Sequence, residues 1–160
     1  MRLGWLALIS VLGAPQTNAP FPDFRALDVA GQKQSTTRWR GSTTLIVAIT
    51  DRGAGDAMRG WFEAAGKRAP GARLGGIISI SVPFFVSDEY ARQKAREQIP
   101  KAYWHDNFFD AHHTISSFLG LPESRVPWAF VLDAQGRVLA QAHAAWSASE
   151  SKAVWAALSR

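Results

Sequence analysis

Histidine is the residue type in this chain best suited to bind a metal or to move a proton near neutral pH. A metal site needs several ligands that converge, usually at helical or turn spacings. His105 precedes His112 by seven residues, whereas His112 and His113 are adjacent and would point to different faces of a helix. We therefore keep His105, His112 and His113 as weak candidate metal ligands, expect them to be surface histidines, and expect no bound cofactor.

Thiol chemistry is excluded, because the chain contains no cysteine. Disulfides, thiolate metal sites and thiol nucleophiles all require that residue. There is also no Gly-x-Ser-x-Gly motif, and the glycine-rich run 71–76 lacks the Gly-Lys-Ser/Thr ending of a phosphate loop. The sequence names no catalytic residue, so it leaves enzymatic activity open and leans against it.

The charge balance is basic but diffuse. Lysine and arginine number 18 against 13 aspartate and glutamate, which gives a formal net charge of +5. The densest basic stretch, residues 92–101, is accompanied by Glu89 and Glu97, as on the solvated face of a helix. No recognisable nucleic-acid-binding pattern accompanies it, so nucleic acid is not an expected partner.

These side chains must be positioned by strands that alternate with helices. The expected strands are 43–50, 77–82, 128–132 and 137–142, preceded by a short hairpin that turns at Ala30-Gly31. The expected helices carry residues 58–65 or begin at Ser87, Asp110 and Ser147, and the aromatic insertion around Phe108 and Phe109 is expected to be a loop. This order predicts an α/β fold: a central mixed sheet flanked by helices, with an N-terminal β-hairpin extension.

Three stretches of the chain follow a known family pattern. Residues 21–41 look like an opening hairpin that ends in Arg-Gly, residues 43–50 like a central strand, and residues 124–141 like a segment in which a proline, here Pro127, is cis. In these stretches the chain resembles the thioredoxin-like superfamily, in particular its redoxin, peroxiredoxin and TlpA-like branch. The resemblance implies a thioredoxin-like fold.

The chemistry of that family is missing. Its members place a Cys-x-x-C pair or a peroxidatic cysteine where the central strand enters its helix, and this chain has residues 50–56, Thr-Asp-Arg-Gly-Ala-Gly-Asp, at that place. Thiol–disulfide exchange and cysteine-based peroxide reduction both require a thiolate. The resemblance therefore does not extend to redox activity.

What the resemblance leaves is a groove for an anionic or peptide-like ligand. A cis Val126-Pro127 bond would present the backbone of Val126 to the start of the helix, beside Asp51 and Arg52. Trp128 is expected to fill this groove or to line it. In the alternative interpretation Asp51 only caps the helix, and Pro127 only serves a turn that the fold requires.

The first nineteen residues have the layout of a secretory signal. Arg2 precedes an apolar run from Leu3 to Leu12, and a small-residue exit ends at Ala19. We expect a signal peptide over 1–19 and a thioredoxin-like domain over 20–160. Pro20 follows the expected cut and disfavours it, so an uncleaved anchor is the alternative, and membrane contact is expected only through that anchor.

The expected function is binding rather than redox catalysis. We expect a periplasmic or secreted protein that binds or scaffolds a protein or peptide partner in the cell envelope. Two alternatives stay open. One is a non-thiol enzyme that uses the region around Asp51, and the other is a metal-handling protein that uses the histidines.

Overall fold

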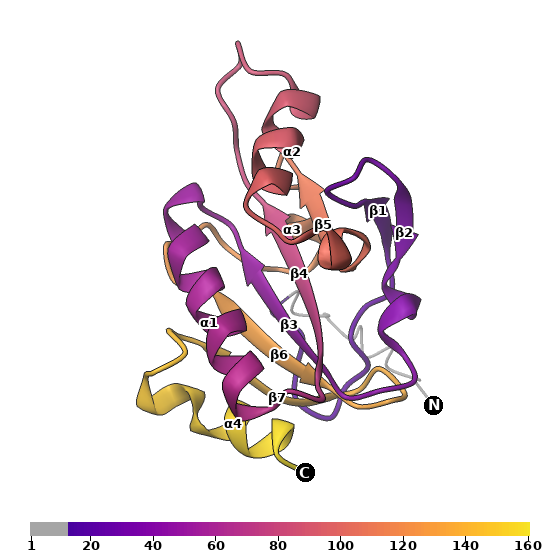
Figure 1. The fold of residues 1–160 in the computed structure, drawn as a ribbon, viewed down its shortest axis with the longest axis vertical. Helices are drawn as coiled ribbons and strands as arrows, with labels where there is room; N and C mark the ends of the chain where they lie inside the picture. Colours follow the sequence, from indigo (N-terminus) through magenta and orange to yellow (C-terminus); the bar gives the residue numbers. More distant parts are fainter. Residues whose placement is uncertain (1–12) are drawn as a thin grey trace, which may run out of the picture.

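The computed structural model describes residues 13–160. They form a five-stranded sheet with helices on both faces and a separate two-stranded hairpin (Figure 1). The strands are β1 Arg25–Leu27, β2 Lys33–Ser35, β3 Thr44–Ile49, β4 Arg73–Ser79, β5 Asn107–Asp110, β6 Trp128–Leu132 and β7 Val138–His143. The helices are α1 Gly55–Arg68, α2 Asp88–Glu97, α3 Thr114–Phe118 and α4 Lys152–Leu158.

The large sheet has the order β5-β4-β3-β6-β7. β3 pairs parallel with β4 and β4 pairs parallel with β5, whereas β6 is antiparallel to both β3 and β7. All six residues of β3 are buried. A strand covered on both faces needs an unbroken apolar run, and for this reason the sequence predicts this strand well.

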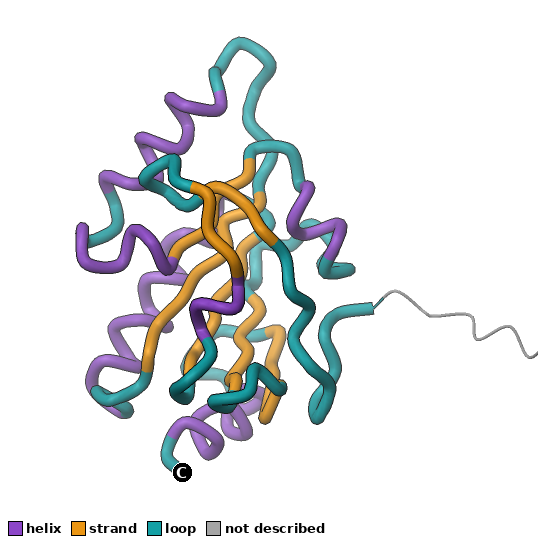
Figure 2. The backbone as a smooth tube through the Cα atoms, turned by 90° about the vertical axis from the view of Figure 1, so that its right-hand side faces the viewer, coloured by secondary structure: helices purple, strands orange, loops and turns teal. Residues whose placement is uncertain are grey.

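Each face of the sheet has its own hydrophobic core. Met58 and Trp61 of α1 and Val154 of α4 pack on one face. Trp39 and Ile115 pack on the other face, the latter from α3. Figure 2 shows α3 on the side of the sheet opposite to α1 and α2. The two faces of the sheet can therefore be considered separately. The face covered by α1 is the one next to the end of β3.

Two adjacent glycines in β4 keep room for large side chains on both faces. A Cβ added at Gly75 would lie 2.6 Å from Nε1 of Trp39, and one added at Gly76 would lie 2.0 Å from Oδ1 of Asn107. Neighbouring residues of a strand point to opposite faces. The pair thus lets Trp39 and Asn107 approach the sheet backbone from its two sides.

Residues that precede β3 pair with both edges of the sheet. At the β5 edge the Val29 N–H donates to the Asn107 carbonyl (2.9 Å). At the β7 edge the Val138 N–H donates to the Ala19 carbonyl (2.9 Å), and the Asn18 N–H donates back to Val138 (2.8 Å). These bonds attach the segment 18–29 to the sheet.

The expected leader falls largely outside the described residues, which exclude Arg2 and the apolar run from Leu3 to Leu12. Pro15 is buried and Ala14 packs against the core on the α3 face. The boundary after Ala19 stays a prediction. Between residues 13 and 160, no helix is long and apolar enough to cross a membrane.

The predicted fold class is confirmed, including the mixed sheet and the N-terminal hairpin that turns at Gly31, where φ is +84°. One strand was missed, and the helix expected to begin at Asp110 begins at Thr114. The aromatic insertion forms the edge strand β5, in which Phe108 and Phe109 are 0% and 4% exposed. A strand this short takes its conformation from pairing with β4, which local sequence does not reveal.

Candidate functional site

Two of the polar residues between β3 and α1, Thr50 and Asp51, have structural partners. Asp51 Oδ1 accepts a hydrogen bond from the Gly53 N–H (2.6 Å) and so caps the short 3₁₀-helix Arg52–Ala54 that leads into α1. The Thr50 hydroxyl donates to the Pro122 carbonyl (3.0 Å) and accepts from the Ser124 N–H (2.8 Å). These bonds fix the loop before β6 beside the start of α1, in the place where the resemblance expects cysteine.

The Val126-Pro127 bond is trans, because residues 13–160 contain no cis peptide bond, and the cis prediction is wrong. The Val126 N–H donates to the Ser124 hydroxyl (3.1 Å), and the Val126 carbonyl lies 3.0 Å from Nε2 of His143. Both backbone groups that would bind a peptide are therefore engaged within the chain. The ring of His143 is held in this position by stacking on Trp128, with ring centroids 3.8 Å apart.

Trp128 does not take the expected place at the start of α1. It is 5% exposed and belongs to the core on the α3 face of the sheet, with Phe130 and Ile115. Trp128 pairs with Ala48 of β3 on one side and His143 of β7 on the other. Asp51 and Arg52 thus lie near the Val126 loop, but Trp128 neither fills nor lines a groove there.

The three candidate metal ligands have three separate partners. His105 Nδ1 lies 2.8 Å from Asp28 Oδ2, His112 Nε2 lies 2.8 Å from Asp88 Oδ2, and His113 Nδ1 lies 3.3 Å from the Ser116 hydroxyl. No group of three acidic or histidine side chains in the described chain converges as metal ligands would. The histidines do not form one site.

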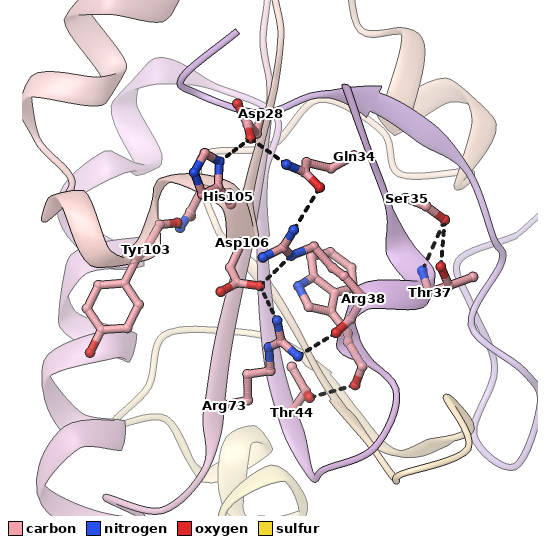
Figure 3. A network of polar contacts seen from close by, with 12 residues as sticks. Asp28, Gln34, Ser35, Thr37, Arg38, Thr44, Arg73, Tyr103, His105 and Asp106 are labelled. Carbon is pink, nitrogen blue, oxygen red and sulfur yellow. Dashed lines mark hydrogen bonds and ion pairs between the residues drawn. The ribbon is translucent and has the colours of Figure 1, made fainter. Parts of the chain in front are cut away.

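The Asp28–His105 contact belongs to a polar network that joins the N-terminal hairpin to the sheet (Figure 3). Asp106 lies at its centre, and its Oδ1 accepts hydrogen bonds from Arg38 Nε (2.8 Å) and Arg73 Nη2 (2.9 Å). Asp28 is fully buried. Burial by itself raises the pKa of Asp28, but hydrogen bonds from His105 and neighbouring groups outweigh it and hold the pKa below its ordinary value of 3.8.

A cleft of about 780 Å³ lies between α1 and α2 and is the feature that sequence reasoning missed. Ile78, Ile80 and Phe109 form its floor. One wall comes from α1, residues 55, 58, 59, 62, 63 and 66. The other comes from residues 90, 91, 94 and 95 of α2 and from its C-cap residue Gln98. The cleft begins beside Arg52, where β3 enters α1.

The two walls differ in how their helices are packed. The opposite face of α1 is buried, and Trp61 stacks on Trp155 of α4 with ring centroids 5.0 Å apart. In contrast, no residue of α2 is buried. Ala91 and Ala95 are partly buried against the core on the α1 face, and both also line the cleft. The signal in the sequence was Phe62, an aromatic residue beside the Trp61 face of α1.

The loop between β4 and α2 borders this cleft and projects at the top of Figure 1. Pro83 and Val86 line the cleft, while Phe84 is 100% and Phe85 is 76% exposed. The two phenyl rings contact each other edge to face, with centroids 5.5 Å apart. An apolar pair presented to water in this way is typical of a surface that contacts another molecule.

Comparison with known proteins gives similarity in structure alone: no family model and no curated protein matches the sequence. A protein assigned as the thiol:disulfide interchange protein DsbE from Chlorobium tepidum has a TM-score of 0.63 at 16% identity, over 91% of this chain and 99% of its own. A thio-disulfide isomerase from Thermus thermophilus has a TM-score of 0.57 at 18% identity, over 89% of this chain and 94% of its own. A thiol peroxidase from Chromobacterium violaceum has a TM-score of 0.55 at 16% identity, over 82% of this chain and 78% of its own. At such identities the similarity concerns the fold, and the chain is therefore a thioredoxin-like fold without a cysteine.

Proposed function

We propose that this chain is an exported binding protein of the cell envelope that works without thiol redox chemistry. The redox part follows from composition: with no cysteine, the chain has no thiolate to attack a disulfide or a peroxide. Export is supported by the arrangement of Arg2, the apolar run and Ala19 in the leader. Binding is the use of this fold that needs no sulfur.

The observation that carries the binding proposal is the exposed pair Phe84 and Phe85. Two phenylalanines in water are unfavourable, and burial of such a ring against a partner is worth about 1.5–3 kcal/mol. They lie on a loop that joins two packed elements, so a partner can reach them without unfolding the domain. We propose that this loop contacts a protein partner.

The peptide-binding groove at Val126, which the family resemblance leads us to expect, is a weaker candidate for that contact. The N–H and carbonyl of Val126 already have partners in Ser124 and His143, so a peptide would have to displace both. The proposed contact therefore moves from the Val126-Pro127 region to the Phe84–Phe85 loop. The enzyme and metal-handling alternatives receive no support from the described side chains around Asp51 or from the three histidines.

Affinity capture from envelope extract tests the partner contact. The bait is the full chain after whatever processing it undergoes, compared with Phe84→Ser/Phe85→Ser and with Phe118→Ser, a control that removes another exposed ring from α3 (54% exposed). We expect the same protein to be retained by the wild type and the control and lost with the double variant. Equal retention by all three, or by none, contradicts the loop as a contact surface.

Two further measurements test the rest of the proposal. Cell fractionation with mass spectrometry of the N-terminus should find the chain outside the cytoplasm, with the cut after Ala19 or an intact leader. Insulin reduction and peroxide consumption should be at background, and turnover in either assay would contradict the absence of thiol-type chemistry.

A further inference from the structure

The floor of the cleft between α1 and α2 belongs to the hydrophobic core and is only slightly exposed. Phe109, Ile80 and Ile78 are only 4%, 7% and 8% exposed, although all three line it. A helix is about 10 Å across with its side chains and could not contact such a floor. A slender chain could, and the volume of about 780 Å³ lies within the range of small-molecule sites.

The cleft is also long. It follows α1 from Gly55 to Gly66, a distance of about 16 Å at the rise of an α-helix. The floor and most of the wall side chains are apolar, among them Phe62 and Leu74. An extended hydrocarbon chain that lay along the floor would bury its own apolar surface and the exposed parts of the wall side chains, such as Phe62 and Leu74. Burial of apolar surface is the main source of favourable free energy for such a ligand.

Cations from both walls meet at the mouth of the cleft. Arg59 of α1 reaches across it and donates from Nη2 to Oε1 of Gln98 (3.2 Å). Lys94 precedes Gln98 by one turn on the same face of α2. Arg59 and Lys94 therefore flank the same stretch of the opening from its two sides.

These two cations have only weak partners of their own. Arg59 lies 3.3 Å from Asp56, and Lys94 lies 3.4 Å from Glu97, with all four side chains at least half exposed. Pairs of this kind contribute little and exchange readily. Both cations are thus available to an incoming anion.

The lining as a whole favours negative charge. Its charged side chains are Arg52, Arg59 and Lys94 against a single carboxylate, Glu63. With a cationic or neutral head, Arg59 and Lys94 would keep only their exposed partners, Asp56 and Glu97. An anionic head between Arg59 and Lys94 would form charge-assisted hydrogen bonds with both.

We infer that the cleft between α1 and α2 binds a single-chain amphiphile with an anionic head, of the long-chain carboxylate class. The hydrocarbon chain lies along Ile78, Ile80 and Phe109, and the head lies between Arg59 and Lys94. This adds a small-molecule ligand to the proposed partner contact at the Phe84–Phe85 loop. The two are separable, because the loop variant keeps both cations and the whole floor.

A fluorescent carboxylate tests the inference. Dansylaminoundecanoate is titrated into the protein below its micelle concentration, and dodecanoate or dodecylammonium is then added as competitor. We expect the dansyl emission to rise and shift to the blue on binding, and dodecanoate to displace the probe at a concentration about tenfold lower than dodecylammonium. No emission change, or equal displacement by the two competitors, overturns the inference.

Two variants and a matched control locate the ligand. Arg59→Gln/Lys94→Gln should weaken dodecanoate binding about tenfold. Lys33→Gln/Lys152→Gln, which removes two exposed charges elsewhere, should leave it unchanged. Ala95→Trp, on a helix with no buried residue, should block the cleft and abolish binding. Equal loss in the two double variants, or full binding by Ala95→Trp, contradicts the assignment.

Discussion

Removal of the Asp28 carboxylate should be among the most destabilising changes of a polar side chain in this protein. Asp28 Oδ1 accepts from the backbone N–H groups of Ala30 and Gln32, both at 2.9 Å, and fixes the turn between β1 and β2. Its Oδ2 contacts His105 at 2.8 Å and Gln34 at 3.2 Å. The Asp28 side chain is fully buried, whereas its partners are partly exposed, so the four bonds are partly shielded from water.

The magnitude follows from what each substitution leaves behind. Asp28→Ala leaves two N–H groups and His105 without their acceptor, at about 1–3 kcal/mol for each buried donor. Because Ala30 and Gln32 themselves lie near the surface, water replaces part of this loss. We expect Asp28→Ala to lower the free energy of unfolding by about 2–4 kcal/mol. Asp28→Asn keeps one acceptor oxygen and loses the charge, so about 1–2 kcal/mol is expected.

The assay is urea unfolding at pH 7, followed by tryptophan fluorescence. With no cysteine in the chain, unfolding and refolding can be compared without a reducing agent. Asp23→Asn is the matched control: Asp23 pairs with Arg40 at 2.7 Å, but the two side chains are 54% and 50% exposed. Its loss should cost less than about 1 kcal/mol.

The pH dependence gives a second, independent check. The pKa of Asp28 is lower in the folded state than its ordinary value of 3.8. Ionised Asp28 therefore stabilises the folded protein at any pH above 3.8. That contribution is lost as the pH falls below 3.8 and through the folded-state pKa. The gap between the wild type and Asp28→Asn should therefore close on acidification. A gap that is constant with pH, or a loss no larger than that of Asp23→Asn, would refute this account of Asp28.

Three other outcomes are expected. Gly76→Ala should lower the free energy of unfolding by about 1–3 kcal/mol, because the added Cβ would lie 2.0 Å from Oδ1 of Asn107; an unchanged thermal midpoint would contradict this packing. A variant that begins at Pro20 should be about 1–3 kcal/mol less stable than one that begins at Gly13, since it loses two backbone hydrogen bonds to Val138, and chemical unfolding of the two proteins measures the difference. Zinc or copper should leave the thermal midpoint of the wild type unchanged, and an upshift that depends on the histidines would revive the metal-handling alternative.

The elements that could be predicted are those whose own residues show how they are buried or where they turn. β3 is a continuous aliphatic run, and the two hairpins carry glycines at Gly31 and Gly136 with φ of +84° and +82°. β5 could not be predicted, because four residues hold too little pattern to reveal a partner strand.

The candidate site was predicted less well, because its features depend on distant contacts. The contact of His143 with Val126 arises from the β6–β7 register, which pairs Trp128 with His143. The cleft depends on how far apart α1 and α2 lie in the fold, and the local sequence of either helix does not reveal that distance. The resemblance located the start of α1 correctly but carried with it a cis bond and an open peptide ledge, and neither is present among residues 13–160.

The segment 18–29 has a consequence for solubility. A five-stranded open sheet has two edge strands, and an unpaired edge is a template on which another chain can add a strand and aggregate. Here Val29 occupies part of the β5 edge, and Asn18 and Ala19 occupy part of the β7 edge. Processing that removed Asn18 and Ala19 would free the N–H and carbonyl of Val138, the first residue of β7. The position of a leader cut would then determine how readily the protein self-associates, as well as where it is delivered.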